Sequence, residues 1–475
     1  MASGAGSLIV ELTVQEMAKL LRVPLIGKPK RGHVEICSDS RTFRAGQVFW
    51  ALKGPNFDGH AFVEESFNKG GVAAVVEREW YEQNGRPARV YVPVGDTQQA
   101  LTSLAKSYAA RFRIPKIAIT GSNGKTTTKD MIAAVLRRAG KTLATEGNFN
   151  NHIGVPLTLF GLRKTHRYAV LEMGTNHPGE IALLSETARP TLAVVTNIGW
   201  SHLENFGTKE AIRDEKLTII AGFSRPGTLF LNVDDPLLCD FRPGPRCKLM
   251  TFGIHRGQIR PDDLKLGPDG CASFRIGRTP FRLTVPGLHN VYNALAAVSV
   301  GLHLRIPKSE AAAALASFAP PKFRMQVKRV GSLVILDDCY NANPSSMRSA
   351  LSTLAAYQSE GRRIAVLGDM LELGVDSERL HTETGHFLME MGVQELYTFG
   401  SMSRHINQGA RDKGLPRQNA HHFSDFDLML NELAADLRPG DVVLVKASRG
   451  MRLERVHETL RALAGAGTLS WGNVK

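Results

Sequence analysis

Between a short β-branched run and a stretch with helical character, the sequence reads Thr120-Gly121-Ser122-Asn123-Gly124-Lys125-Thr126-Thr127. We expect a strand at 117–119 to lead into this loop and a helix at 125–138 to follow it. Glycines let backbone N–H groups approach phosphate oxygens, and a helix N-terminus adds positive potential there. Lys125 would reach the β- and γ-phosphates, and the Thr126 hydroxyl would bind Mg²⁺. The loop therefore predicts a nucleoside triphosphate site.

The loop departs from the full phosphate-binding motif at one position, because Ala118 stands where the first glycine is expected. The alternative is an ordinary glycine-rich turn between a strand and a helix. The order of strand, loop and helix favours the phosphate site, since it is the context that such a loop requires.

The same alternation continues beyond the loop. Short apolar runs at 169–171, 192–195 and 229–231 are separated by helical stretches. Strands that alternate with helices predict a mostly parallel, doubly wound sheet. We assign it to a central domain, residues 115–320.

Similar α/β patterns flank this domain. The N-terminal part, 1–114, has strand-like runs at 48–52 and 73–76 and a helix around 61–68. After Pro320-Pro321, which do not continue a helix easily, a second series begins. It has strands at 333–336, 364–367, 396–399 and 442–445, with helices at 346–356 and 379–391. We expect three α/β domains, the last being Rossmann-like and spanning 321–475.

Composition excludes several classes of protein. The 475 residues carry a net charge of +14 that is dispersed, without a basic stripe interleaved with aromatics, so nucleic acid is not an expected partner. The five cysteines are odd in number and contain no C-x-x-C pair, which favours a reducing cytosol. No window approaches the roughly 20 apolar residues of a membrane span. We expect a soluble, cytoplasmic monomer without membrane insertion.

The motifs together resemble those of the Mur ligases and the related folylpolyglutamate synthetases. The shortened T-G-x-N-G-K-T loop carries the resemblance, and further segments extend it over nearly the whole chain. The resemblance implies three domains: a small N-terminal α/β domain for the UDP part of the acceptor, a central ATP-binding domain of the P-loop type, and a C-terminal Rossmann-like domain.

Three residues beyond the loop resemble the family's metal ligands. Glu172 follows a predicted strand, where parallel sheets place ligand sites, and its carboxylate suits Mg²⁺. His202 corresponds to a residue that serves a second Mg²⁺, although imidazole is not the preferred ligand of that ion. Lys216 matches a lysine that is carbamylated in the family. From the residues alone, these could be a capping Glu, a satisfied His and a salt-bridging Lys.

The resemblance also implies contacts with ATP and with the substrates. Residues that would bind ATP are Gly121, Ser122, Asn123, Gly124, Lys125, Thr126, Thr127, Asn290, Asn293, Arg324 and Asp338. Residues that would bind the UDP-peptide or the incoming amine are Ser40, Arg41, Lys53, Asp58, His60, Asn150, Asn151, Lys446, Ser448 and Arg449. The chain departs from the family at His152, where an acidic or amide residue is expected, and at Ala447, which is usually Gly.

The implied activity is ATP-dependent amide-bond formation through an acyl phosphate, with Lys125, Glu172, His202 and Lys216 in catalytic roles and two Mg²⁺ ions. The acceptor would be UDP-N-acetylmuramoyl-tripeptide. The incoming amine would be D-alanyl-D-alanine, in the synthesis of the peptidoglycan precursor. The Asp-Asn-Pro-Arg motif of the diamino-acid-adding branch is absent, and segments 340–346 and 368–374 resemble the dipeptide-adding branch.

Three alternatives stay open from the sequence. The first is another amino-acid-adding Mur-type ligase, and the second is a folylpolyglutamate-type synthetase, which would lack the UDP-like segments near Arg41 and Asp58. The third is a P-loop ATPase that uses the nucleotide as a switch, which would need neither Arg324 nor Asp338 from a third domain.

Overall fold

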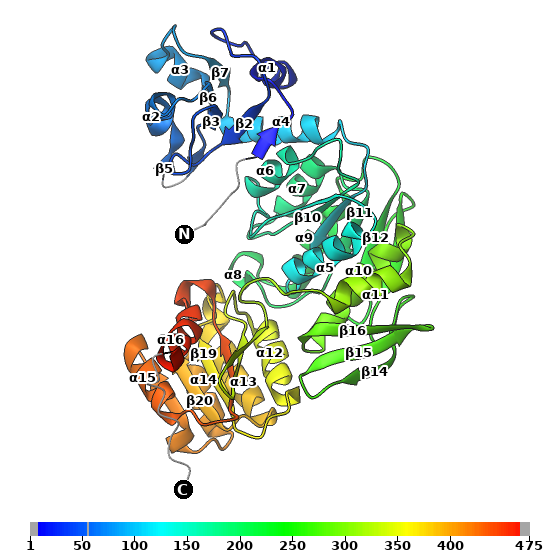
Figure 1. Ribbon diagram of the computed structural model, residues 1–475, viewed down its shortest axis with the longest axis vertical. Helices are drawn as coiled ribbons and strands as arrows, with labels where there is room; N and C mark the ends of the chain where they lie inside the picture. The colour runs from blue at the N-terminus through cyan, green and yellow to red at the C-terminus, as the bar shows by residue number, and fades with distance from the viewer. Residues whose placement is uncertain (1–7, 55–56, 466–475) are drawn as a thin grey trace.

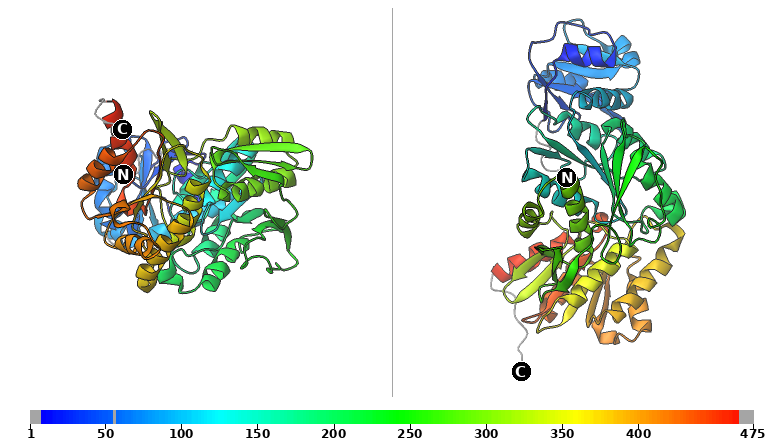
Figure 2. Two further views of the ribbon diagram at one scale, coloured as in Figure 1. Left: turned by 90° about the horizontal axis from the view of Figure 1, so that it is seen from below. Right: turned by 90° about the vertical axis from the view of Figure 1, so that its right-hand side faces the viewer.

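The computed structural model describes residues 8–54 and 57–465, and all statements below concern these ranges. They form three α/β parts arranged in a row along the long axis of the molecule, as Figures 1 and 2 show. Each part has its own sheet, which confirms the predicted α/β class. The order along the chain is also the order in space.

The N-terminal part is built on a five-stranded sheet of order β1-β2-β3-β6-β7. Its strands are β1 (Leu8–Val10), β2 (Val34–Cys37), β3 (Gln47–Trp50), β6 (Ala73–Glu77) and β7 (Tyr91–Val94). A two-stranded ribbon, β4 (Lys53–Gly54) and β5 (Phe57–Asp58), lies beside it. The helices are α1 (Val14–Leu21), α2 (Val63–Asn68), α3 (Arg78–Asn84) and α4 (Thr97–Ala109).

Helix α4 joins this part to the central one. It packs against α6 and α7 of the central part, and the Tyr108 hydroxyl donates to the Leu162 carbonyl at 2.8 Å. The Lys116 amine, which is buried, donates to the Ala109 carbonyl at the end of α4. A cation at a helix C-terminus satisfies carbonyls that have no partner within the helix. The junction is therefore packed and hydrogen-bonded.

The central part has a six-stranded, all-parallel sheet of order β13-β12-β11-β8-β10-β9. Its strands are β8 (Lys116–Thr120), β9 (Thr142–Ala144), β10 (Tyr168–Glu172), β11 (Leu192–Val195), β12 (Gly227–Asn232) and β13 (Cys247–Phe252). Its helices are α5 (Lys125–Arg137), α6 (Gly154–Phe160), α7 (Glu180–Ala188), α8 (Leu203–Phe206), α9 (Lys209–Leu217), α10 (His289–His303) and α11 (Lys308–Ala316).

Strand β8 shows why this sheet is covered on both faces. Ile117 and Ile119 belong to the core cluster that contains α5 and α10, whereas Ala118 belongs to the cluster that contains α4, α6 and α7. Successive side chains of a strand point to opposite faces. A continuous apolar run therefore needs helices on both sides, which confirms the predicted doubly wound sheet.

A three-stranded antiparallel sheet was not predicted. It consists of β14 (Asp262–Leu266), β15 (Cys271–Ile276) and β16 (Thr279–Pro286), and it packs against α11. In β16 the buried side chains alternate, with Phe281, Leu283 and Val285 facing the core. This alternation is the pattern of a half-buried antiparallel strand.

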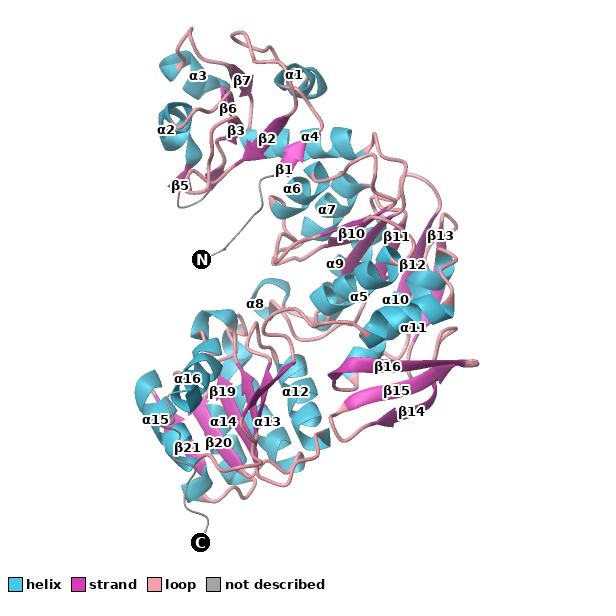
Figure 3. Ribbon diagram, in the orientation of Figure 1, coloured by secondary structure: helices cyan, strands magenta, loops and turns pink. Residues whose placement is uncertain are grey.

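The C-terminal part has a six-stranded sheet of order β17-β18-β22-β19-β20-β21. Its strands are β17 (Gln326–Val330), β18 (Leu333–Asp337), β19 (Arg363–Gly368), β20 (Glu395–Phe399), β21 (Ala420–Phe423) and β22 (Val442–Lys446). Only β17, at the edge, is antiparallel. Helices α12 (Pro344–Ala356), α13 (Ser377–Glu390) and α14 (Arg404–Asp412) cover one face, and α15 (Phe426–Asp436) and α16 (Glu454–Gly465) cover the other, as Figure 3 shows.

Two simpler expectations can be compared with the structure. All five cysteines lie in the described ranges, and none of them forms a disulfide. Among the helices of residues 8–54 and 57–465, none has the length and apolar character that a membrane span requires.

Candidate active site

A cavity of about 850 Å³ lies where the central and C-terminal parts meet. Residues that follow β8, β10 and β11 line it from the central side, and residues that follow β18, β19 and β22 line it from the C-terminal side. Ligand sites of parallel sheets lie at these carboxyl ends. The cavity is therefore formed by the corresponding edges of two different sheets.

The predicted phosphate loop forms part of the cavity wall. Gly124 precedes α5 with a φ of 78°, and Gly121 has a φ of 147° beside the hydroxyl of Thr196. Side chains rarely tolerate positive φ, and a Cβ at Gly121 would collide with that hydroxyl. Gly121 therefore permits the close approach of the loop to Thr196, which follows β11, and the first N–H groups of α5 have no partner within the helix.

Strand β11 and the residues after it hold the loop in place. The Ser122 N–H donates to the Asn197 carbonyl at 2.9 Å, and the Asn123 N–H donates to Asn197 Oδ1 at 2.9 Å. The Thr196 hydroxyl donates to the Asn123 carbonyl at 2.6 Å. These bonds fix the backbone of the loop before any ligand contributes, which is the preorganisation that phosphate binding needs.

Lys125 is folded back over its own loop. Its Nζ donates to the Gly121 carbonyl at 2.7 Å and to the Ser122 carbonyl at 3.3 Å. Burial lowers the pKa of Lys125 to about 8; the nearby Glu172 carboxylate opposes this shift, and Arg324 adds to it. An anion that brings negative charge next to Nζ raises that pKa again, so the site favours a negatively charged ligand.

Glu172 has one carboxylate oxygen with a partner and one without. Asn150 Nδ2 donates to its Oε1 at 2.8 Å, and the Glu172 N–H donates to the Thr145 hydroxyl at 3.0 Å. Glu172 is buried, and no hydrogen bond from residues 8–54 or 57–465 reaches its Oε2. Buried polar atoms are normally satisfied. This oxygen, at the cavity, fits a hard cation such as Mg²⁺.

Lys216 is only 2% exposed, and no hydrogen bond or ion pair within the described residues reaches its amine. Burial lowers its pKa well below the usual value, and the charge of Lys125 lowers it further. The neighbouring Glu215 accepts from the Gly179 and Ile181 N–H groups at 2.7 and 2.8 Å, which anchors α9 to the start of α7. Lys216 is thus held beside Lys125 as a buried amine, although it does not itself line the cavity.

His202 lines the cavity and contacts the C-terminal part. Its Nδ1 lies 2.7 Å from Glu372 Oε2, and this proximity lowers the pKa of the Glu372 carboxyl. Both residues have left-handed backbones, with φ values of 52° and 64°. Such conformations in residues other than glycine cost free energy, and they concentrate at functional sites.

Arg324 and Asp338 line the cavity from the C-terminal part. The Arg324 guanidinium lies 4.0 Å from the centre of the Tyr340 ring. Asp338 Oδ2 accepts from Lys446 Nζ at 2.5 Å, and the Lys446 amine also donates to the Asn341 carbonyl at 2.9 Å. Lys446 is therefore fully engaged in holding the loop that follows β18.

Asn290 and Asn293 line the cavity and also connect helices α10 and α5. Asn293 Oδ1 accepts from the Thr128 hydroxyl at 3.0 Å, and Asn293 Nδ2 donates to Asn290 Oδ1 at 2.9 Å. A Cβ on Gly124 would lie only 2.5 Å from Asn293 Oδ1. The two amides thus brace the phosphate loop from the side opposite β11.

Two long segments of the chain match models of known protein domains. A model of the Mur ligase middle domain matches residues 119–301, and a model of the Mur ligase glutamate ligase domain matches residues 323–449. A UDP-N-acetylmuramoyl-tripeptide–D-alanyl-D-alanine ligase of Bacillus subtilis is 36% identical over 459 residues, which are 95% of this chain and 99% of that relative. The chain belongs to the Mur ligase family.

Solved structures agree with this assignment. A crystal structure of MurF from Acinetobacter baumannii matches with a TM-score of 0.87 and 30% identity, covering 96% of this chain and 100% of that one. MurF ligase from Thermotoga maritima, solved in complex with ADP, matches with a TM-score of 0.79 and 30% identity, covering 91% and 98%. The chain is therefore an enzyme of a ligase family and has the three-domain fold of MurF.

The N-terminal residues expected to bind UDP do not line the cavity of this Mur ligase. The Arg41 side chain is 84% exposed and pairs with Asp39 at 2.7 Å. Lys53 and Asp58 face each other on the β4–β5 ribbon. His60 is buried, with Nδ1 2.6 Å from Asp58 Oδ1 and Nε2 accepting from the Glu77 N–H at 2.9 Å. Both ring nitrogens of His60 therefore have partners, and the contact with its Nδ1 holds the Asp58 carboxylate in place.

Three other expected substrate residues have identifiable structural contacts. The Ser40 carbonyl accepts from Lys69 Nζ at 2.8 Å. Asn151 Oδ1 accepts from the Ile153 and Gly154 N–H groups, so it caps the start of α6. The Ser448 hydroxyl accepts from the Leu371 N–H at 2.9 Å.

Sequence reasoning missed the contacts that join the two sides of the cavity. Asn343 Nδ2 donates to Asn123 Oδ1 at 2.8 Å, which links α12 directly to the phosphate loop across 220 residues of sequence. Glu372 meets His202 in the same region. Both residues lie in segments that resemble the dipeptide-adding branch, but no local pattern indicates which partner each would find.

Few of the residues that we expect to hold a metal ion belong to the usual ligand types. Within the described ranges, no group of three or more His, Cys, Asp or Glu side chains could hold a metal ion. The predicted set contains only Glu172 and His202 from these residue types, and Thr126 and Lys216 supply the rest. The free Glu172 oxygen fits a cation, and the buried Lys216 amine fits the family's carbamate.

Proposed function

We propose that this enzyme joins D-alanyl-D-alanine to UDP-N-acetylmuramoyl-tripeptide with conversion of ATP to ADP and phosphate. The observation that carries the proposal is the single cavity in which the phosphate loop meets residues 338–346, 371–373 and 446–450 of the C-terminal part. The relative of Bacillus subtilis, named for this reaction, supports it over nearly the full length of both chains.

The reaction takes place in two steps. The C-terminal carboxylate of the tripeptide attacks the γ-phosphorus, the bond to the β-γ bridging oxygen breaks, and an acyl phosphate and ADP form. The dipeptide amine then attacks the acyl carbon, phosphate leaves, and the amine loses a proton. Lys125 and the N–H groups at the start of α5 stabilise the charge of the transferring phosphoryl group, since positioning and charge neutralisation dominate such reactions.

We propose that Thr126, Glu172, His202 and Lys216 hold two Mg²⁺ ions. The ions would supply positive charge to the phosphate oxygens. Glu172 Oε2 is buried and has no hydrogen-bond partner, so it can bind such an ion. Because burial lowers the pKa of Lys216, its neutral amine is available to form an N–C bond with CO₂ and release one proton. The resulting carbamate supplies anionic oxygen ligands.

Asn290, Asn293, Arg324 and Asp338 are proposed to contact ATP, and Ser40, Arg41, Lys53, Asp58 and His60 are proposed to hold the UDP part. On this basis we propose domain limits of 1–114, 115–320 and 321–475. Since the substrates are charged and do not cross membranes unaided, we propose that the enzyme acts in the cytoplasm. A monomer contains every residue of the proposed site.

A competition assay tests the proposal. Purified enzyme, ATP, Mg²⁺ and UDP-muramoyl di- or tripeptide are offered D-alanyl-D-alanine, lysine, diaminopimelate or glutamate, and phosphate release is measured. Release only with the dipeptide, and only on the tripeptide acceptor, is expected. Turnover of a diamino acid on the dipeptide acceptor would instead indicate another Mur-type ligase. Release without any acceptor would indicate an ATPase.

A further inference from the structure

Leu371 is a large apolar side chain that is open to the cavity. It is 47% exposed, and it lines the cavity between the two sides. Among the large apolar side chains of residues 8–54 and 57–465 that are similarly exposed, Leu371 alone lines this cavity. An exposed apolar side chain in a ligand cavity marks a place for an apolar group of a ligand.

The backbone around Leu371 is fixed. The Leu371 N–H donates to the Ser448 hydroxyl at 2.9 Å, and the Ser448 N–H donates to the Asp369 carbonyl at 3.1 Å. The Met370 N–H donates to Nε2 of the buried His381 at 3.0 Å. A Cβ added at Gly450 would lie 3.1 Å from Leu371 Cδ1. The side chain is thus held against the segment that carries Ser448 and Arg449.

Arg449 is the cation that directly precedes Gly450 in the chain, and it lines the same cavity as Leu371. Its side chain is 52% exposed, and its guanidinium lies 2.8 Å from Glu454. The Lys446 amine, by contrast, is buried and bonded to Asp338 and Asn341. Because a guanidinium has five N–H donors, Arg449 can keep its ion pair with Glu454 and still donate hydrogen bonds to a ligand carboxylate.

We propose that Leu371 determines specificity for the incoming dipeptide by packing against one of its methyl groups while Arg449 receives its carboxylate. This inference rests on the proposed function. D-Alanyl-D-alanine has two methyl groups and one carboxylate, which match this pair of side chains. A diamino acid would place a charged amine against Leu371 and lose hydration without compensation.

The test compares dipeptides that differ by one methyl group. Wild-type enzyme and Leu371→Ala are assayed with D-alanyl-D-alanine, D-alanyl-glycine and glycyl-D-alanine. We measure kcat/KM, or the inhibition constant against D-alanyl-D-alanine for a dipeptide that is not turned over. Removing one methyl contact in an apolar pocket costs about tenfold in kcat/KM. Leu371→Ala should lose about tenfold with D-alanyl-D-alanine and less than about twofold with the dipeptide that lacks the contacting methyl.

Val375→Ala is the matched control. Val375 is also apolar and exposed, lies four positions along the same loop, and does not line the cavity, so its kcat/KM values should be unchanged. An equal loss for all three dipeptides, or no loss in Leu371→Ala, would overturn the inference. If the wild-type enzyme shows phosphate release with none of the dipeptides, the proposed function itself fails. The unchanged KM for ATP in Leu371→Ala verifies the fold.

Discussion

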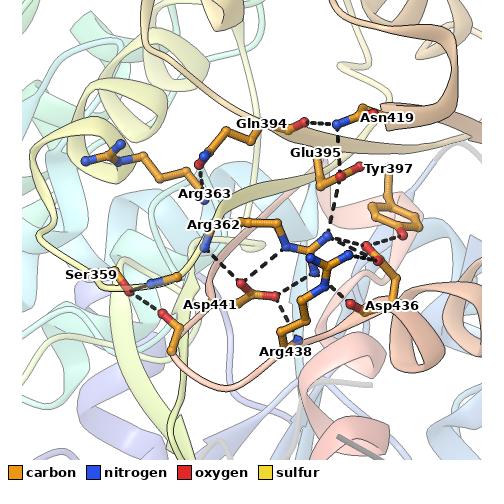
Figure 4. Close-up of polar contacts among 12 residues, drawn as sticks. Ser359, Arg362, Arg363, Gln394, Glu395, Tyr397, Asn419, Asp436, Arg438 and Asp441 are labelled. Atoms are coloured by element: carbon orange, nitrogen blue, oxygen red, sulfur yellow. Dashed lines mark hydrogen bonds and ion pairs between the residues drawn. The ribbon is translucent and has the colours of Figure 1, made fainter. Parts of the chain in front are cut away.

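The two edges of the C-terminal sheet carry polar clusters of opposite character. At the amino ends, Arg362 bonds Asp436 at 2.9 Å and Asp441 at 2.8 Å, and it approaches Glu395 at 3.4 Å, as Figure 4 shows. Tyr397 adds a bond to Asp436 at 3.1 Å. At the carboxyl ends, Leu371 and Arg449 face a cavity whose opposite wall contains Glu172 with one oxygen unpaired.

The difference in hydrogen bonding suggests that one cluster serves stability and the other serves function. The Arg362 guanidinium is engaged by three carboxylates, so it has little capacity left for a ligand, and the cluster joins the starts of β19, β20 and β22. Glu172, in the cavity wall, keeps an unpaired carboxylate oxygen, and Lys216, which is buried near Lys125, has an amine without partners. Both cost stability unless a ligand compensates. We therefore expect changes in the first cluster to lower the free energy of unfolding, and changes in the second to lower turnover.

Lys125→Ala should have the largest effect. If Lys125 stabilises phosphoryl transfer as proposed, its loss should reduce kcat by about 10³-fold. The affinity for the UDP-peptide should be nearly unchanged, because the residues proposed to hold the UDP part lie on another domain. Phosphate release and equilibrium binding of the UDP-peptide measure the two effects. Arg137→Ala, at the other end of α5, is the control. Near-normal turnover in Lys125→Ala would show that the loop assignment is wrong.

Lys216→Ala should lower turnover by about 10²-fold while the enzyme stays folded, because a buried amine without partners contributes little to stability. Short carboxylic acids should partly restore turnover by replacing the carbamate oxygens. Since burial lowers the pKa of Lys216, its amine loses its proton more readily than that of an exposed lysine, and the neutral form declines as the pH falls. Incubation in acidic buffer free of CO₂ should therefore inactivate the wild-type enzyme, and bicarbonate at neutral pH should restore it. A fully active Lys216→Ala variant contradicts the carbamate.

Arg362→Leu tests the other side of the comparison. Removing one partner from a largely buried ion cluster leaves carboxylates uncompensated and should lower the free energy of unfolding by about 3 kcal/mol. Urea denaturation measures this loss, and kcat below the unfolding transition should be unchanged. Arg438→Ala is the control, because that side chain is 57% exposed and lies 3.8 Å from Asp436, so less than about 0.5 kcal/mol is expected. A loss of kcat in the folded Arg362→Leu variant would show that this cluster contributes to turnover as well as to stability.

Asn343→Ser should have the smallest effect of these variants, and it tests a single contact between the two sides of the cavity. Asn343 caps α12 through the Ser346 N–H and also donates to Asn123 on the phosphate loop. Serine preserves the cap but is too short to reach Asn123. Losing one hydrogen bond between the domains, worth about 1 kcal/mol, should raise the KM for ATP about fivefold. Steady-state kinetics with ATP as the varied substrate measure it; an unchanged KM would show that this contact does not assist ATP binding.

Local patterns predicted a large part of the fold. The strand, loop and helix around Lys125 were found because glycines, a β-branched run and helix formers act over a few residues. The sheet β14–β16 was missed, although Phe281, Leu283 and Val285 alternate with polar residues. That alternation is short, and the pattern of strands and helices that indicates a parallel sheet is much stronger in the same domain. The edge strand β17 was missed because its burial is incomplete.

By itself, the sequence determined the phosphate loop, the two parallel sheets and the family resemblance, since each depends on residues close together in the chain. Only the tertiary structure decided that Asn343 meets Asn123, that Glu372 meets His202, and that Leu371 rather than Val375 faces the cavity. The first two contacts join residues from different domains, and all three arrangements depend on the packing of the whole chain. The sequence shows which chemical groups are present, whereas the free energy of long-range packing determines which of them lie next to one another.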